Sequence, residues 1–103
     1  MVKVKWNEEA LLDIDEIAEY IAVDSVTYAM IQVDNFFNRA EDLTNAPYLG
    51  VTVPEFNDEN LRQLLEGSYR IIYEIKSKGL IEILCVIHGM RLLEGHTTFK
   101  KKK

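Results

Sequence analysis

The first half of the chain shows two different spacings of apolar residues. Val2, Val4 and Trp6 alternate with lysines, which predicts a half-buried strand. Beyond Asn7, a favoured N-cap residue, apolar residues recur every three or four positions and predict a helix of about five turns ending near 24–25. A second helix, capped by Asp24 or Ser25, follows with almost no linker, so the two form an antiparallel hairpin. The first apolar stripe consists of Ala10, Ile14, Ile17, Ala18 and Ile21, and the second of Ala29, Val33, Phe36, Ala40 and Leu43.

The second half begins with a turn-rich connection and continues with strands. Residues 44–60 are rich in Asn, Asp, Pro and Gly, which predicts a long loop. Three runs at 61–65, 69–75 and 80–87 are rich in β-branched and aromatic residues, and short Gly-containing segments separate them. These runs predict a three-stranded antiparallel meander. An N-terminal strand, a helical hairpin and this meander make an α+β fold with the helices on one face of the sheet.

The run 80–87 is apolar at almost every position, which predicts a central strand covered on both faces. The helices cover one face, and a short C-terminal segment or a bound partner could cover the other. The residues from Glu94 onward are few and polar, which favours the partner. We therefore expect one domain over residues 2–93 and a flexible polar and basic tail over 94–103, ending in the lysine run.

Length and composition agree with this organisation. The 103 residues are 48% hydrophobic and 28% charged, as in a single small folded domain. The only cysteine, Cys85, cannot form an intramolecular disulfide, so we expect a protein of the reducing cytoplasm. No apolar stretch reaches 18 residues, so no membrane association is expected.

Charge is distributed unevenly along the chain. Residues 1–59 carry three basic and thirteen acidic groups, and residues 60–103 carry nine basic and four acidic groups, within a net charge of −5. Four of those nine basic groups are the terminal lysines. A site that faces phosphate must therefore be local and built from a few arginines, because no broad basic surface is present.

Three arginines in the strand half are the candidates for such a site. Arg62, Arg70 and Arg91 each sit at or beside a predicted strand end. Strand alternation places Arg70 with Ile72 and Glu74 on the face away from the helices, where a guanidinium could hold a phosphate or carboxylate. The alternative is a structural Arg70 paired with Glu74 or with a partner's carboxylate.

His88-Gly89-Met90-Arg91 directly follows the last strand. A histidine that exchanges protons near neutral pH, beside a fixed cation, could support acid–base work on a phosphodiester; the alternative is a hydrogen-bonded structural histidine. The two histidines and one cysteine have no metal-ligand spacing, and the carboxylates of the first helix, Glu9, Asp13, Glu16 and Glu19, fit a solvated face. We therefore expect no metal and no cofactor.

Two motifs in the strand half point to a known family. The run from Leu61 to Glu74, which contains Gly67-Ser68-Tyr69-Arg70-Ile71-Ile72-Tyr73, and the run Val86-Ile87-His88-Gly89-Met90-Arg91 resemble the RelE/ParE superfamily of type II toxin–antitoxin toxins. The resemblance spans roughly residues 2–93. It implies a helical hairpin on an antiparallel sheet, and a cognate antitoxin that covers exposed toxin surface and is the only route to operator DNA.

Activity divides within this superfamily. RelE-like members cut mRNA on the ribosome, and for such a member Arg70, Arg91 and His88 would be the catalytic residues. ParE-like members inhibit DNA gyrase and are not nucleases; Arg62, Arg70 and Arg91 would then bind the target. The paired lysines of RelE-like members are absent near Leu61, no tyrosine follows Arg91, and His96 is a poor substitute. The resemblance therefore favours a ParE-like gyrase inhibitor over a ribosome-dependent endonuclease or an inactive antitoxin-binding relative.

Overall fold

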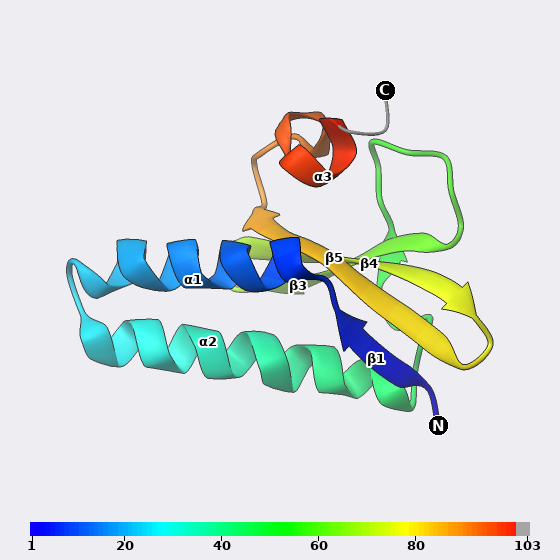
Figure 1. The fold of residues 1–103 in the computed structure, drawn as a ribbon, viewed down its shortest axis with the longest axis horizontal. Helices are drawn as coiled ribbons and strands as arrows, with labels where there is room; N and C mark the ends of the chain where they lie inside the picture. The colour runs from blue at the N-terminus through cyan, green and yellow to red at the C-terminus, as the bar shows by residue number, and fades with distance from the viewer. Residues whose placement is uncertain (101–103) are drawn as a thin grey trace.

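The computed structural model describes residues 1–100, and its elements occur in the predicted order. An N-terminal strand and two helices precede an antiparallel set of strands, which confirms the α+β prediction. The helices pack side by side on one side of the sheet, and the C-terminal helix lies apart from them (Figure 1). The elements are β1 (Lys3–Trp6), α1 (Glu8–Ala22), α2 (Val26–Glu41), β2 (Val51–Thr52), β3 (Leu61–Glu66), β4 (Tyr69–Ser77), β5 (Leu80–His88) and α3 (Thr97–Lys100), with 3-10 turns at Asp42–Thr44 and Leu93–Gly95.

The predicted caps define the helical hairpin. The side chain of Asn7 accepts a hydrogen bond from the Glu9 amide at 2.7 Å, and that of Ser25 accepts one from the Tyr28 amide at 3.0 Å. Each bond satisfies an amide that lacks a partner in the first helical turn. The first helix ends at Ala22, slightly earlier than predicted, and Ser25 begins the second.

The sheet has five strands in the order β1-β5-β4-β3-β2. The predicted meander forms β3 to β5, and β1 adds to β5 in parallel, with Val4 opposite Ile81. This places β5 in the interior of the sheet, as its apolar sequence predicts. The two-residue strand β2, inside the predicted loop, pairs with β3.

A separate apolar cluster lies on each face of the sheet. On the helix face, Phe36 of α2 is fully buried with Ile71, Tyr73 and Ile83. On the second face, Ile72, Cys85 and Ile87 pack with residues outside the sheet. Those residues are Val53 and Phe56 of the long loop and Leu93 and Phe99 of the C-terminal segment.

The C-terminal segment differs from the polar tail predicted from residue 94. Leu93, His96 and Phe99 are all buried, and the Phe99 ring stacks on Phe56 with 5.2 Å between ring centroids. Their three-residue spacing puts them on one side of two short helical turns, so a few residues suffice to cover the second face. The cover is thus supplied by the chain itself, through residues 93–99 and through Val53 and Phe56 of the long loop. Residues 101–103 of the predicted tail lie outside the described residues.

Within the part of the chain that the structure describes, no helix has the length and apolar character needed to cross a membrane.

Candidate functional site

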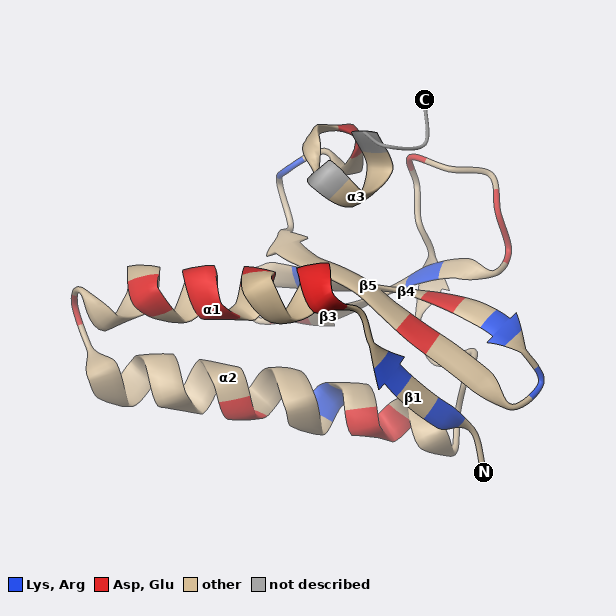
Figure 2. Ribbon diagram, viewed as in Figure 1, with Lys and Arg blue, Asp and Glu red and all other residues tan. Residues whose placement is uncertain are grey.

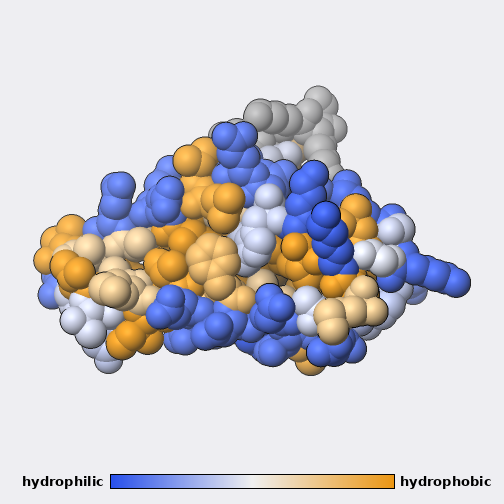
Figure 3. Space-filling model, turned by 60° about the horizontal axis from the view of Figure 1, so that its bottom comes forward, coloured by the Kyte–Doolittle hydropathy of each residue, from blue (hydrophilic) through white to orange (hydrophobic). Residues whose placement is uncertain are grey.

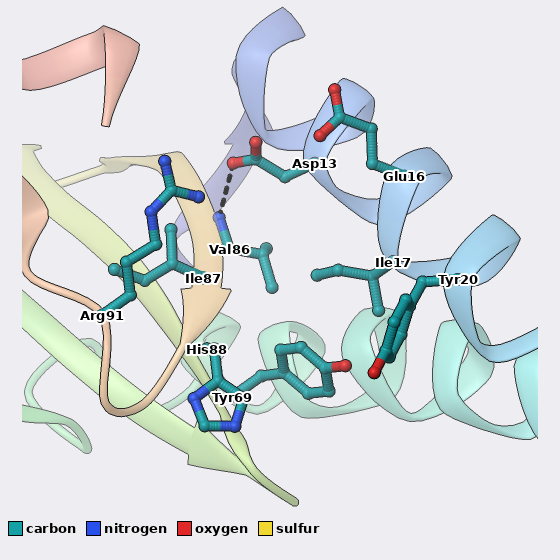
Figure 4. Close-up of a pocket in the computed structure, with 9 residues that line it drawn as sticks. All are labelled: Asp13, Glu16, Ile17, Tyr20, Tyr69, Val86, Ile87, His88 and Arg91. Carbon is teal, nitrogen blue, oxygen red and sulfur yellow. Dashed lines mark hydrogen bonds between the residues drawn. The ribbon is translucent and has the colours of Figure 1, made fainter. Parts of the chain in front are cut away.

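A pocket of about 330 Å³ lies between α1 and the ends of β4 and β5 (Figure 4). It brings together several residues that the sequence singles out, including His88 and Arg91. The lining residues are Asp13, Glu16, Ile17, Tyr20, Tyr69, Val86, Ile87, His88 and Arg91.

A tight turn after β5 sets the positions of His88 and Arg91. The Gly89 amide donates to the Ser68 carbonyl at 2.7 Å, and a Cβ at Gly89 would lie 3.2 Å from that oxygen. The Arg91 amide then donates to the His88 carbonyl at 3.0 Å, closing the turn. His88 is exposed, and its Nδ1 accepts a bond from the Met90 amide at 3.2 Å. In the neutral ring the proton therefore lies on the other ring nitrogen, Nε2.

Aromatic side chains and carboxylates form the rest of the wall. The Tyr69 ring meets His88 edge-on with 5.8 Å between centroids, and the Tyr69 and Tyr20 hydroxyls turn toward each other (Figure 4). Asp13 and Glu16 face this space from α1, and Figure 4 shows the Arg91 guanidinium on the Asp13 side. One arginine thus shares the pocket with two carboxylates, a balance that does not favour an anionic ligand.

Arg70 lies on the predicted face but not in an open position. Its residue surface is only 5% exposed, and both terminal nitrogens bind Glu55, at 2.9 and 2.8 Å. The same guanidinium donates to the Gln63 side chain at 3.0 Å and to the carbonyl of Arg91. The hydrogen bond from Arg70 lowers the pKa of Glu55, and the Leu93 amide adds to the effect. Arg70 is therefore paired within the chain, as in the structural alternative, but with Glu55 and not with Glu74 or a partner's carboxylate.

Arg62 lies on the opposite face of the sheet and holds the long loop. Its Nε donates to the Gly50 carbonyl at 2.9 Å, and its Nη1 donates to the Glu59 carbonyl at 2.8 Å. Its guanidinium also lies 5.2 Å from the centre of the Tyr48 ring. Of the three candidate arginines, only Arg91 lines the pocket with His88, so the structure does not gather them into one site.

The sequence analysis missed a cluster beneath this pocket. Asp13 lies partly buried, where it accepts the Val86 amide at 2.9 Å and faces Nε2 of His96 at 2.8 Å. This corrects the interpretation of Asp13 as part of a solvated helix face. His96 is 3% exposed, so the residue judged a poor catalytic substitute holds the C-terminal segment onto α1. The sequence held one signal for this burial. Asp13 lies three residues after Ala10, and His96 three residues after Leu93, so each shares a helix face with an apolar residue.

Cys85 lies close to this pair, and the three ligand atoms fall within 4.8 Å of one another. Carboxylate, thiolate and imidazole are ligand types that zinc uses. However, Nδ1 of His96 accepts a hydrogen bond from the Thr98 amide at 3.0 Å. In a neutral ring the proton therefore lies on Nε2, which donates a hydrogen bond to Asp13. Burial, together with the nearby Asp13 charge, raises the pKa of the Cys85 thiol and keeps it protonated. The cluster is therefore best described as a hydrogen-bonded contact that joins α1, β5 and the C-terminal segment.

A second concave surface lies between the two helices, and we call it the hairpin groove. It has a volume of about 440 Å³ and is mostly apolar. Val26 and Met30 line it and are 64% and 65% exposed. Figure 3, which looks from the α2 side, shows apolar side chains gathered over the hairpin between polar strips. The lining residues are Ala18, Glu19, Ala22, Val26, Ala29, Met30, Val33 and Asp34.

Solved structures with the same fold belong to toxin–antitoxin systems. The chromosomal ParDE system from P. aeruginosa superposes with a TM-score of 0.70 at 23% identity, over 85% of this chain and 96% of that one. A mutant of the E. coli toxin RelE in the free state gives a TM-score of 0.59 at 15% identity, over 86% and 84%. The RelBE2 toxin–antitoxin complex from Mycobacterium tuberculosis gives 0.51 at 24%, over 84% and 96%.

Sequence comparison is more specific about the family. No curated protein sequence matches the chain. The family model described as the ParE toxin of the type II toxin–antitoxin system parDE matches residues 4–93, from the first strand to Leu93 of the C-terminal segment. The match covers most of the chain, and the superfamily prediction made from the Tyr69-Arg70 and His88–Arg91 motifs is confirmed. The chain belongs to the ParE toxin family of type II toxin–antitoxin systems.

Proposed function

We propose that this ParE-family toxin acts in the cytoplasm by binding and inhibiting a bacterial DNA gyrase or related topoisomerase, and that a cognate antitoxin neutralises it. The ParE family match and the similarity to the P. aeruginosa ParDE system support this proposal. Inhibition by binding requires no cofactor and no metal. Operator DNA would be reached through the antitoxin.

The proposal rests chiefly on the partners that the structure gives to the three candidate arginines. Arg70 is neutralised by Glu55, and Arg62 is engaged with loop carbonyls. Arg91 remains exposed, but it shares its pocket with Asp13 and Glu16. Nucleic-acid binding draws much of its strength from several cations placed against phosphates. The described surface offers no such group of cations around the pocket, which favours a protein target over an RNA substrate.

One observation favours the alternative, a ribosome-dependent mRNA endonuclease. His88, Tyr69 and Arg91 line one pocket, and together they offer a proton acceptor, a proton donor and a cation. In that case His88 and Arg91 would carry the reaction. The buried ion pair of Arg70 excludes it from contact with a phosphate unless Glu55 moves away.

The hairpin groove is the surface that best fits an antitoxin. Val26 and Met30, both exposed, line it together with Ala22 and Val33, and such an exposed apolar surface on a small protein marks a protein-binding site. A groove between two helices accepts an amphipathic helix, whose apolar side chains enter between the two helical ridges. Because the long loop and residues 93–99 already cover the second sheet face, the antitoxin is not needed there.

Induced expression in a bacterial host without antitoxin tests the proposal. We expect filamentation, a DNA-damage response and loss of supercoiling activity by purified gyrase in the presence of the protein. Rapid translation arrest with cleaved transcripts would instead establish the endonuclease. Normal growth with abundant folded protein would indicate an inactive relative.

The Arg91→Ala variant identifies the target-binding residue. Arg91 is exposed, and among the described residues its side chain makes only a long hydrogen bond, at 3.5 Å, to the Gly95 carbonyl, so we expect the variant to fold normally and to lose toxicity. Arg39→Ala is the matched control, because Arg39 lies on α2 and pairs with Asp42 at 3.2 Å. Equal toxicity of both variants would exclude Arg91 from the target surface, and an insoluble Arg91→Ala variant would show that its role is structural.

A further inference from the structure

The hairpin groove combines an apolar floor with unpaired carboxylates. Glu19 of α1 and Asp34 of α2 line the groove, and Ala22, Val26 and Met30 form the apolar surface between them. Both carboxylates are exposed, and neither makes a hydrogen bond or an ion pair among the residues that the structure describes. Negative charge therefore flanks an apolar surface on both helices.

The charge of the whole hairpin has one sign near the groove. Helix α1 carries six carboxylates and no lysine or arginine, and Figure 2 shows them along its length. On α2 the only cation is Arg39, in the last turn, where Asp42 neutralises it. No cation of either helix is thus left to pair with Glu19 or Asp34. A helix that docks here must supply cations or bury these carboxylates without a partner, which is costly.

We propose that the segment that docks in the hairpin groove is a basic amphipathic helix, in which lysines or arginines flank an apolar stripe and pair with Glu19 and Asp34. This proposal rests on the proposed function, since the segment belongs to the antitoxin. It adds the chemistry of the recognition: apolar contact supplies most of the affinity, and charge selects the segment. Acidic segments are repelled, which prevents binding of antitoxins with the opposite charge pattern.

A second copy of this chain fits the groove poorly. Two hairpins placed groove to groove would bring Glu19 and Asp34 of one copy against the same residues of the other. Like charges at an interface core oppose association. The charge pattern therefore selects a basic partner over self-association.

Two synthetic helical peptides with the same leucine stripe and length test this proposal directly. One carries lysines beside the stripe and the other carries glutamates. We expect the lysine peptide to bind the full-length protein, with an affinity that falls as salt rises, and NMR shifts confined to the residues of the groove. Equal binding of both peptides, or binding of neither, would overturn the proposal.

Charge-neutral variants locate the effect. We expect the double variant Glu19→Gln and Asp34→Asn to lower the affinity for the lysine peptide by about tenfold and to remove most of the salt dependence of its binding. The matched control is Asp58→Asn with Glu59→Gln, which makes the same change of charge on the exposed loop. Equal effects of the two double variants would show that only net charge matters and would contradict a specific site.

Two further measurements separate the possible failures. If sedimentation shows a dimer that Met30→Glu dissociates, the groove is a self-association surface and the proposal is wrong. If the protein inhibits gyrase but does not discriminate between the peptides, this inference fails while the proposed function stands. If the lysine peptide binds as expected but gyrase is unaffected, the inference stands and the target is different.

Discussion

The two faces of the sheet are closed by different chemistry. On the helix face, Phe36, Ile71 and Tyr73 are fully buried between the helices and the sheet, and apolar packing joins the layers together with a few hydrogen bonds, such as that from the Val86 amide to Asp13. On the second face, the long loop and the C-terminal segment form the cover, and two polar contacts hold them: the ion pair of Glu55 with Arg70 and the hydrogen bond of His96 with Asp13. The first face therefore depends mainly on apolar packing. The second face depends on a few polar groups, so single substitutions and pH should act there locally.

The largest expected effect is the loss of packing on the helix face. Phe36→Ala removes a fully buried ring that meets Tyr69 edge-on, and we expect a loss of about 4 kcal/mol in the free energy of unfolding. Phe37→Ala is the matched control, because Phe37 is 40% exposed and should cost much less. Urea unfolding followed by circular dichroism measures both. Equal losses would contradict the burial difference between these neighbours.

Removal of the buried guanidinium is expected to have the next largest effect. Arg70→Ala leaves Glu55 partly buried without its partner, and we expect a loss of about 3 kcal/mol in the free energy of unfolding. A double-mutant cycle with Glu55→Ala should show strong coupling, since the two residues act as a pair. Additive losses would show that Arg70 stabilises the fold in another way.

The contact that holds the C-terminal segment should have a smaller and more local effect. His96→Ala removes the partner of Asp13, and we expect a loss of about 2 kcal/mol. Hydrogen exchange should accelerate in residues 93–99 while α1 and α2 stay protected. The exposed His88 provides the control, since His88→Ala should leave the free energy of unfolding and the exchange rates of residues 93–99 nearly unchanged. Uniform acceleration across the chain would mean that the two faces open together.

The smallest expected effect is a pH dependence of the second face. Arg70 holds the pKa of Glu55 below its usual value of 4.5, so this carboxylate binds a proton more readily in the unfolded chain than in the native protein. The resulting stabilisation is present above pH 4.5 and is lost as pH falls through the native pKa. Thermal unfolding between pH 6 and 3 should show a steeper decline for the wild type than for Glu55→Gln. Identical declines would exclude this carboxyl group as the cause.

Local spacing was sufficient to predict most of the fold. The three- and four-residue stripes and the residues Asn7 and Ser25 predicted the helices, and alternation predicted the strands of the meander. The parallel pairing of β1 with β5 and the two-residue strand β2 depend on contacts between distant segments, which one sequence does not display.

The candidate site was predictable only in part, for a similar reason. Alternation placed Arg70 on the correct face, but its partner Glu55 comes from a turn-rich loop whose path has no periodic signal. Asp13 and His96 are 83 residues apart, and each looks like an exposed polar residue when only its neighbours are considered. The motif that contains His88 and Arg91 is contiguous, so the sequence alone brought those two residues together.

The burial of Cys85 makes the single thiol a reporter of how the molecule opens. The side chain lies in the apolar cluster of the second face, beside the hydrogen-bonded pair of Asp13 and His96. An alkylating reagent can reach it only when the C-terminal segment lifts or when the whole chain unfolds. The rate of modification, compared with the rate of global unfolding, therefore measures how often this one side of the toxin is uncovered in its native state.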